Sequence, residues 1–332
     1  MARTLSAIIV ALIAAAAGVT FFNGGLSGLL GGEPQLAWPH NDGSDFPAAR
    51  AQFKTQVTVK SSDTAAAPSP PPAIFRKVTY PSAVGPLAAY LTPDPKDGQK
   101  HPAVVWITGG DCNALGEMWE PADPKNDQTA TAFRKAGLVL MAPSLRGGNN
   151  NPGVRQAFAG EIDDVVAAAD FLSQQPYVDP TRIYLGGHST GGTLALLTAE
   201  ASSRFRATFA FGPAHRAEYQ LENIDFDKLD PRERLLRAPE YWLASAKKPT
   251  FVLEGNKDPS NIPALKRMRE LSHNPNIQFL AVEGATHFTI LAPITAVVAD
   301  KIVHDTGPTS NIEITEADLF RDFVRFSTRI AR

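Results

Sequence analysis

Two hydrophobic patterns divide the chain near residue 73. From Ala73 onward, short runs rich in apolar and β-branched residues alternate with longer segments whose apolar residues recur every three or four positions. The short runs predict strands at Ile74 to Tyr80, Leu87 to Leu91, Ala103 to Thr108, Leu138 to Ala142, Arg182 to Gly186, Ala207 to Phe211, Thr250 to Glu254 and Ile277 to Val282. The longer segments predict helices at Thr129 to Lys135, Glu161 to Gln174, Gly191 to Ser202, Ile262 to Leu271, Leu291 to Val303 and Glu316 to Ile330, the last capped by Thr315.

The order of these elements predicts the fold class. The first two strands are close together in the sequence and form an antiparallel pair, whereas the later strands alternate with helices. We therefore expect a three-layer α/β domain over residues 73–332, with an eight-stranded, mostly parallel sheet and helices on both faces.

The first 72 residues have a different pattern. An uncharged apolar run of 18 residues extends from Leu5 to Phe22 behind Arg3, which predicts a signal anchor, or a cleaved signal peptide, over residues 1–22. A buried core helix is the alternative. The basic flank predicts that the body of the protein is exported, attached to the membrane by this segment or secreted if the segment is cleaved.

Glycine, alanine and proline dominate the stretch that follows, which predicts a flexible linker over residues 23–72. Within it, the alternation of apolar and polar residues from Phe53 to Val59 is compatible with an edge strand.

Composition narrows the function classes. Hydrophobic residues make up 43% of the chain and charged residues 20%, which are ordinary values for a globular protein. The net charge of −2 with no long basic run gives no basis for binding nucleic acid. Cys112 is the only cysteine, so the chain has neither an internal disulfide nor a metal site built from several cysteines.

The strongest chemical signal is the run from Gly187 to Gly191, Gly-His-Ser-Thr-Gly, between a predicted strand and a predicted helix. A G-x-S-x-G sequence in this context forms a sharp turn that exposes a nucleophilic serine at a helix N-terminus. Ser189 is therefore the predicted nucleophile; a purely structural glycine turn is the alternative.

A serine hydroxyl needs a base to take its proton and a carboxylate to orient that base. His287 follows the last predicted strand and Asp258 follows the strand before it, so both lie beyond the carboxyl ends of parallel strands. We predict a triad of Ser189, Asp258 and His287, with Glu254 as the alternative acid. His188 is adjacent to the serine and is expected to pack or to line the pocket. The other histidines are expected at the surface or at helix ends, with a substrate contact considered only for His215: His40, His101, His215, His273 and His304.

The oxyanion of an acyl-transfer reaction needs backbone donors. The amide of Thr190, at the helix N-terminus, is one predicted donor. The loop after the third strand supplies the other through the amide of Gly110, with Asp111 as alternative; an ordinary Gly-Gly turn is the competing interpretation. Cys112 adjoins this loop and is a candidate for the pocket wall.

Acidic residues open the helix that begins at Glu161, close in sequence to the loop at Arg146. An ion pair between Arg146 and Asp163 or Asp164 is expected to brace that loop, in a structural rather than a catalytic role.

With these residues in view, the stretch from Phe75 to His287 resembles the prolyl oligopeptidase-type catalytic domain of the α/β-hydrolase superfamily. The similarity is carried by the run from Tyr177 to Gly192, by Arg146-Gly147 and by the turn at Asp258. The resemblance implies acyl transfer through an acyl-enzyme, with no metal or organic cofactor. Members that cleave peptides usually carry a β-propeller, for which residues 23–72 are too short, and some use an oxyanion tyrosine where this chain has Thr108.

These considerations leave three hypotheses. A carboxylesterase-like serine hydrolase acting on small esters is preferred, an exported prolyl oligopeptidase-type peptidase acting on short peptides is second, and a non-catalytic binding protein on the same fold is third. Specificity is expected to come from a lid segment at residues 214–248, which contains Tyr219, Tyr241 and Trp242, or else that segment is a surface helix pair without contact to substrate.

Overall fold

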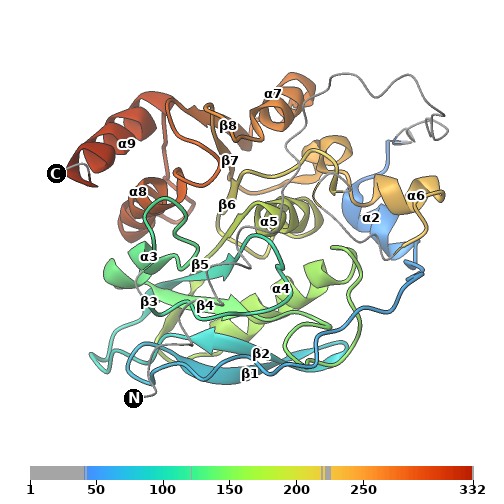
Figure 1. Ribbon diagram of the computed structural model, residues 1–332, viewed down its shortest axis with the longest axis horizontal. Helices are drawn as coiled ribbons and strands as arrows, with labels where there is room; N and C mark the ends of the chain where they lie inside the picture. The colour runs from blue at the N-terminus through green and yellow to red at the C-terminus, as the bar shows by residue number, and fades with distance from the viewer. Residues whose placement is uncertain (1–40, 42, 121, 218–219, 221–225, 331–332) are drawn as a thin grey trace, which may run out of the picture. The chain divides into compact units, whose positions relative to one another are not determined.

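The computed structural model describes residues 41, 43–120, 122–217, 220 and 226–330. Within them, one sheet has the strand order β1-β2-β4-β3-β5-β6-β7-β8 (Figure 1). Its strands are β1 (Arg76–Ser82), β2 (Gly85–Leu91), β3 (His101–Ile107), β4 (Val139–Pro143), β5 (Val178–His188), β6 (Thr208–Phe211), β7 (Thr250–Gly255) and β8 (Ile277–Val282). β1 and β2 are antiparallel to each other, β2 is antiparallel to β4, and the pairs from β4 through β3 to β8 are parallel. The predicted fold class is confirmed.

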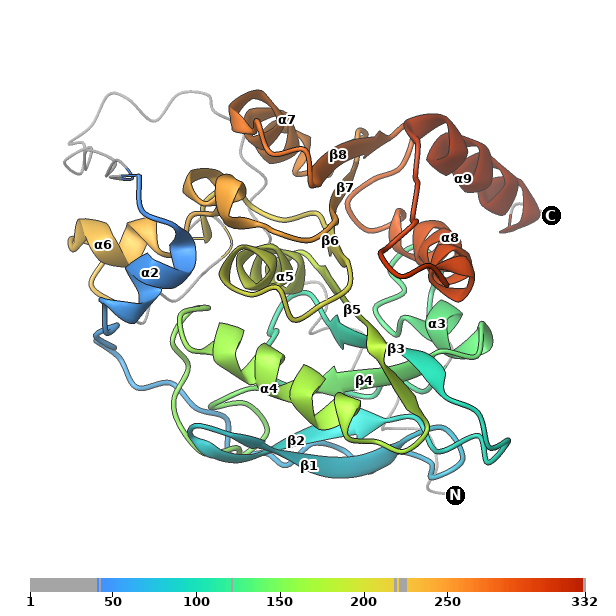
Figure 2. The ribbon, with the colours of Figure 1, turned by 180° about the vertical axis from the view of Figure 1, so that it is seen from behind.

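Helices cover both faces of the sheet (Figures 1 and 2). Helices α3, α8 and α9 lie on one side and α4 and α5 on the other, where α7 packs beside β7 and β8. Their bounds are α3 (Thr131–Lys135), α4 (Glu161–Ser173), α5 (Thr190–Ala201), α7 (Ile262–Leu271), α8 (Leu291–His304) and α9 (Glu316–Ile330). Thr315 caps α9 as predicted, because its hydroxyl accepts a hydrogen bond from the Asp318 amide at 3.1 Å.

Among the boundaries that differ from the prediction, two have clear local reasons. β5 extends beyond Arg182 toward its N-terminal side because a register shift in its pairing with β3 allows Val178 to pair with His101. Helix α3 begins two residues late, because Ala130 adopts a left-handed conformation with φ of 49° and the Thr129 amide bonds to the Asp127 carboxylate.

The expectation of a linker without packing is wrong for residues near Phe46. Helix α2 (Phe46–Ala51) is capped by Asp45 and buries the Phe46 ring, which stacks on Trp242 at 4.9 Å. Farther along, Thr55 donates a hydrogen bond to Glu233 at 2.8 Å. We call residues 43–72 the N-terminal arm, since they pack along the α/β domain.

Two other expectations concern the first residues. Among the described residues, the alternating pattern from Phe53 to Val59 forms no strand, and Val57 makes an isolated bridge with Phe226. The apolar run from Leu5 to Phe22 lies outside the described residues, and no helix in the described part of the chain is long and apolar enough to cross a bilayer.

Candidate active site

Ser189 occupies a strained turn between β5 and α5. Its φ of 55° and ψ of −116° lie outside the regions that L-residues ordinarily adopt. The flanking glycines explain why the turn is possible: a Cβ at Gly187 would collide with the backbone of Gly191, and a Cβ at Gly191 would collide with the backbone of Ile107. The sequence motif therefore has the steric basis expected of a nucleophile elbow.

His287 lies in the loop between β8 and α8 and is almost completely buried, with 2% of its surface exposed. Its Nδ1 donates a hydrogen bond to Oε2 of Glu254 at 2.9 Å. Glu254 is on β7 and is fully buried; its two carboxylate oxygens also accept hydrogen bonds from the amides of Gly255 and Asn261, at 2.7 and 3.1 Å. Both oxygens of the Glu254 side chain therefore have hydrogen-bond donors.

The structure does not bring Asp258 to His287, so the predicted position of the acid is corrected. Asp258 is exposed in the turn after β7, while Glu254, the alternative acid, makes the contact. The physical reason lies in the path of the loop that bears His287: the His287 amide bonds to the carbonyl of Pro259 at 2.8 Å, and Gly212 leaves room for the imidazole beside Glu254.

Ser189 and His287 belong to the same edge of the sheet. The ring of His188, next to the serine, is 4.5 Å from the His287 ring, and the Ser189 amide bonds to the carbonyl of Phe211, which precedes Gly212. A Cβ at Gly212 would overlap the His287 ring. The Ser189 hydroxyl itself has no hydrogen bond to any described residue, which is common in unliganded sites of this type.

Two amides suited to an oxyanion lie beside the serine. The Thr190 hydroxyl donates a hydrogen bond to the Gly110 carbonyl at 2.8 Å, which ties the elbow to the loop after β3. A Cβ at Gly109 would lie 3.1 Å from the Ser189 Cβ, so this loop passes close to the nucleophile. Among the described residues, the amides of Thr190 and Gly110 have no hydrogen-bond partner, as expected of donors that are free to bind a substrate oxygen.

Near this loop, Arg146 pairs with Asp164 rather than with Asp163. The guanidinium donates through Nε and Nη2 to both carboxylate oxygens of Asp164, at 2.8 Å each, and both side chains are buried. This confirms the predicted brace between the loop after β4 and the start of α4. Asp163 instead pairs with Arg50 of the N-terminal arm.

Cys112 is buried next to the oxyanion loop. Burial raises the pKa of its thiol far above the ordinary value, and the nearby carboxylates of Glu161 and Asp111 act in the same direction. The thiol therefore stays protonated and is not a nucleophile.

The predicted lid contains α6 (Pro231–Leu235) and two short 3₁₀ turns, η2 (Pro239–Tyr241) and η3 (Leu243–Ser245). Trp242 is buried against Phe46 and so is part of the core. Tyr219 lies outside the described residues. Gln220 reaches the elbow helix, since its side chain accepts a hydrogen bond from the Thr193 hydroxyl.

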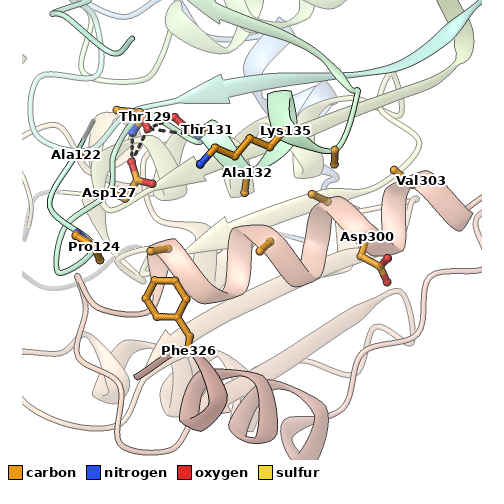
Figure 3. Close-up of a pocket in the computed structure, with 14 residues that line it drawn as sticks. Ala122, Pro124, Asp127, Thr129, Thr131, Ala132, Lys135, Asp300, Val303 and Phe326 are labelled. Carbon is orange, nitrogen blue, oxygen red and sulfur yellow. Dashed lines mark hydrogen bonds between the residues drawn. The ribbon is translucent and has the colours of Figure 1, made fainter. Parts of the chain in front are cut away.

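A groove of about 680 Å³ opens between α3 and α8, with Phe326 of α9 at one side (Figure 3). Alanines line much of it, and Asp127, Lys135 and Asp300 supply charge. None of the candidate catalytic residues lines this groove.

Comparison with known proteins identifies a family for this chain. The sequence matches the prolyl oligopeptidase family over residues 124–290, half of the chain. The chain belongs to the prolyl oligopeptidase family. The matched stretch includes the elbow at Ser189, together with Glu254, Asp258 and His287, but not the loop at Gly110.

Individual relatives of the prolyl oligopeptidase family cover short stretches. Prolyl oligopeptidase A of Amanita bisporigera is 29% identical over 133 residues, 38% of this chain and 16% of that protein. Dipeptidyl-peptidase 5 of Porphyromonas gingivalis is 27% identical over 140 residues, 39% of this chain and 19% of that protein. The chain thus spans less than a fifth of the length of these two relatives.

Solved structures share the fold. An esterase from Pyrobaculum calidifontis has a TM-score of 0.51 at 19% identity, over 69% of this chain and 84% of that one. A puromycin-hydrolyzing peptidase from Mycobacterium tuberculosis has a TM-score of 0.55 at 20% identity, over 69% of this chain and 39% of that one.

Proposed function

We propose that this protein is a serine hydrolase that cleaves carboxylic esters through an acyl-enzyme on Ser189. The observation that carries the proposal is the combination of a strained serine at the start of α5 with a buried histidine whose Nδ1 is held by Glu254 at 2.9 Å. This arrangement leaves Nε2 of His287 as the nitrogen available to accept a proton.

In the proposed reaction, Ser189 Oγ attacks the substrate carbonyl carbon while His287 takes the hydroxyl proton. The oxyanion accepts hydrogen bonds from the amides of Thr190 and Gly110. His287 then gives its proton to the leaving alcohol as the carbon–oxygen bond breaks. Water attacks the acyl-enzyme with His287 again as base, which releases the acid and restores Ser189. Glu254 fixes the imidazole orientation and stabilises its positive charge during both steps.

The likeness to an esterase supports an ester as substrate: the fold of the Pyrobaculum calidifontis esterase matches 69% of this chain. The alternative is an amide substrate, favoured by family membership and by the relatives named as peptidases.

A fluorophosphonate probe tests the nucleophile, because it phosphonylates an activated serine. We expect the full chain to be labelled at Ser189 and Ser189→Ala to remain unlabelled with an unchanged melting temperature. Absence of labelling in the wild-type protein would favour the third hypothesis, a non-catalytic binding protein.

A substrate panel then separates ester from amide hydrolysis. We expect p-nitrophenyl esters of short acids to be turned over, while aminoacyl and prolyl p-nitroanilides are not. Comparable kcat/KM values for esters and for one of these anilides would assign the protein as a peptidase instead.

We also propose that the catalytic domain is exported, on the basis of the apolar run from Leu5 to Phe22 behind Arg3. A reporter enzyme that is active only outside the cytoplasm, fused after residue 72, is expected to be active; the same fusion lacking residues 1–22 serves as the control. Equal activity of the two fusions would contradict export by this segment.

A further inference from the structure

His188, the residue before the nucleophile, is fully buried and uses both of its ring nitrogens. Nε2 lies 2.9 Å from the backbone carbonyl oxygen of His287. Nδ1 lies 2.8 Å from Nε2 of the Gln128 side chain. A side chain that the G-x-S-x-G motif leaves unspecified therefore links two other parts of the site.

Gln128 is itself fixed at both ends. Its side-chain oxygen accepts a hydrogen bond from the Gly109 amide at 3.1 Å, and its backbone carbonyl accepts one from Nε1 of Trp106 at 3.1 Å. Because an amide N–H can only donate, the bond to Gly109 requires the side-chain oxygen at that end and the NH₂ group at the end that faces His188.

These contacts determine the tautomer of His188. Its Nδ1 accepts from the NH₂ group of Gln128 and so carries no proton, while Nε2 carries the proton and donates it to the His287 carbonyl. Burial and the neighbouring His287 hold the pKa of His188 well below its usual range, so the neutral form persists at physiological pH. The neutral ring of His188 therefore has one fixed orientation, in which Nδ1 accepts a hydrogen bond and Nε2 donates one.

We propose that His188 is a positioning residue that holds the backbone of His287 and, through Gln128, the oxyanion loop at Gly109 in register with Ser189. The inference rests on the proposed function, because it assigns His188 to the same reaction. The chain of contacts joins the elbow to the base on one side and to Gly109, which precedes the oxyanion donor Gly110, on the other.

The close, tilted contact between the two histidine rings couples their positions. The His188 and His287 rings are 4.5 Å apart, so a shift of the His287 backbone moves the imidazole that must meet Ser189. Displacements of about 1 Å in a catalytic constellation reduce rates about 100-fold. His188 therefore acts on kcat rather than on substrate binding.

Two substitutions of His188 test the roles of its two ring nitrogens separately. The terminal amide of Gln reaches the place of Nε2, so His188→Gln retains a donor for the His287 carbonyl. The shorter His188→Asn retains only an acceptor for Gln128. In the full chain, we expect kcat for a p-nitrophenyl ester to fall about 10- to 100-fold in His188→Asn, with KM little changed. In His188→Gln, kcat is expected to stay within about 5-fold of the wild-type value.

Gln128→Met provides a second measurement that leaves the elbow sequence intact. It removes the bonds to both His188 and Gly109, and we expect kcat and the rate of fluorophosphonate labelling to fall together by about 10-fold. His304→Asn, at an exposed histidine on α8, is the matched control and is expected to retain wild-type kcat.

The outcomes distinguish this inference from the proposed function. If the wild-type protein is not labelled at Ser189, the proposed function fails and the inference fails with it. If the wild-type protein is labelled but Gln128→Met and His188→Asn keep wild-type kcat, the inference alone is overturned. It is also overturned if His188→Gln and His188→Asn lose kcat equally and in proportion to their melting temperatures, because that result indicates packing alone.

Discussion

Glu254 receives the Nδ1 hydrogen of His287 at 2.9 Å, deep in the protein and with two backbone amides donating to the same carboxylate. Hydrogen bonds to both of its oxygens fix the orientation of the Glu254 carboxylate. Since a neutral imidazole has a single N–H, the bond leaves Nε2 as the basic nitrogen. The relationship makes Glu254 the acid of the proposed triad and gives Asp258 no direct part in it.

Exchanging the two acids by their amides tests this assignment. Glu254→Gln removes the negative charge and can hold the imidazole in the wrong tautomer, so we expect kcat to fall by about 10³-fold or more. Asp258→Asn is the matched control, because Asp258 is exposed in the turn after β7. Its kcat for a p-nitrophenyl ester is expected to stay within about 3-fold of wild type. A larger loss of kcat in Asp258→Asn than in Glu254→Gln would instead identify Asp258 as the acid of the triad.

Gly212 is expected to be intolerant of a side chain for reasons of both backbone and space. Its φ is 60°, and a Cβ would overlap the His287 ring and lie 2.9 Å from Oε2 of Glu254. We expect Gly212→Ala to reduce kcat about 100-fold by displacing the imidazole. Gly98→Ala is the control: φ is 73° there, but no atom lies within 4 Å of the added carbon. Equal kcat in Gly212→Ala and Gly98→Ala would mean that a shift of the His287 ring does not affect catalysis.

The N-terminal arm is expected to contribute to stability. Phe46 is completely buried against Trp242, so Phe46→Ala should lower the free energy of unfolding by about 3–5 kcal/mol. Phe320→Ala, at a side chain that is 42% exposed, should change it by less than about 0.5 kcal/mol. Urea titration of both variants compares the two values. A loss below about 1 kcal/mol at Phe46 would indicate that the arm is not packed in solution.

Glu200 on α5 predicts a stability that depends on pH. It is buried, neither carboxyl oxygen has a hydrogen-bond partner among the described residues, and desolvation raises its pKa well above the ordinary value of 4.5. The folded state therefore binds a proton that the unfolded state releases above that value. The contribution of Glu200 to the free energy of unfolding is therefore highest below pH 4.5. It falls as the pH rises toward the pKa of Glu200 in the folded protein.

The matched comparison is Glu200→Gln, which keeps the shape and removes the titration. We expect the variant to gain stability over wild type between about pH 5 and 8, by at most about 1.4 kcal/mol for each pH unit. Thermal or urea unfolding across this range measures the difference. A difference that is independent of pH would show that Glu200 is ionised in the folded protein.

The fold was predictable because local patterns decide most of it. β8, α7 and α9 begin and end at the predicted residues, since each has a clear period and a clear boundary signal such as Thr315. The nucleophile was predictable for the same reason: the two glycines flanking Ser189 are a local steric requirement that is visible in the sequence.

The acid was not predictable, because the choice between Glu254 and Asp258 depends on the path of another loop. Glu254 lies at the end of the apolar run and Asp258 lies four residues after it. The bond from the His287 amide to Pro259, together with the space beside Gly212, places the imidazole at Glu254. Likewise, the part of Gln128 in the site depends on contacts with Gly109 and His188, 19 and 60 residues away, and no local pattern marks it.

The packing of Phe46 also has a practical consequence for where the catalytic unit starts. Composition places the boundary near residue 73, but the arm's contacts with Trp242, Glu233 and Gly147 belong to the same cooperative structure. A recombinant fragment that begins at residue 73 would expose the hydrophobic surface that Phe46 covers, including Trp242, and would be prone to aggregate. Expression of the enzyme for crystallisation or assay is better begun before Asn41.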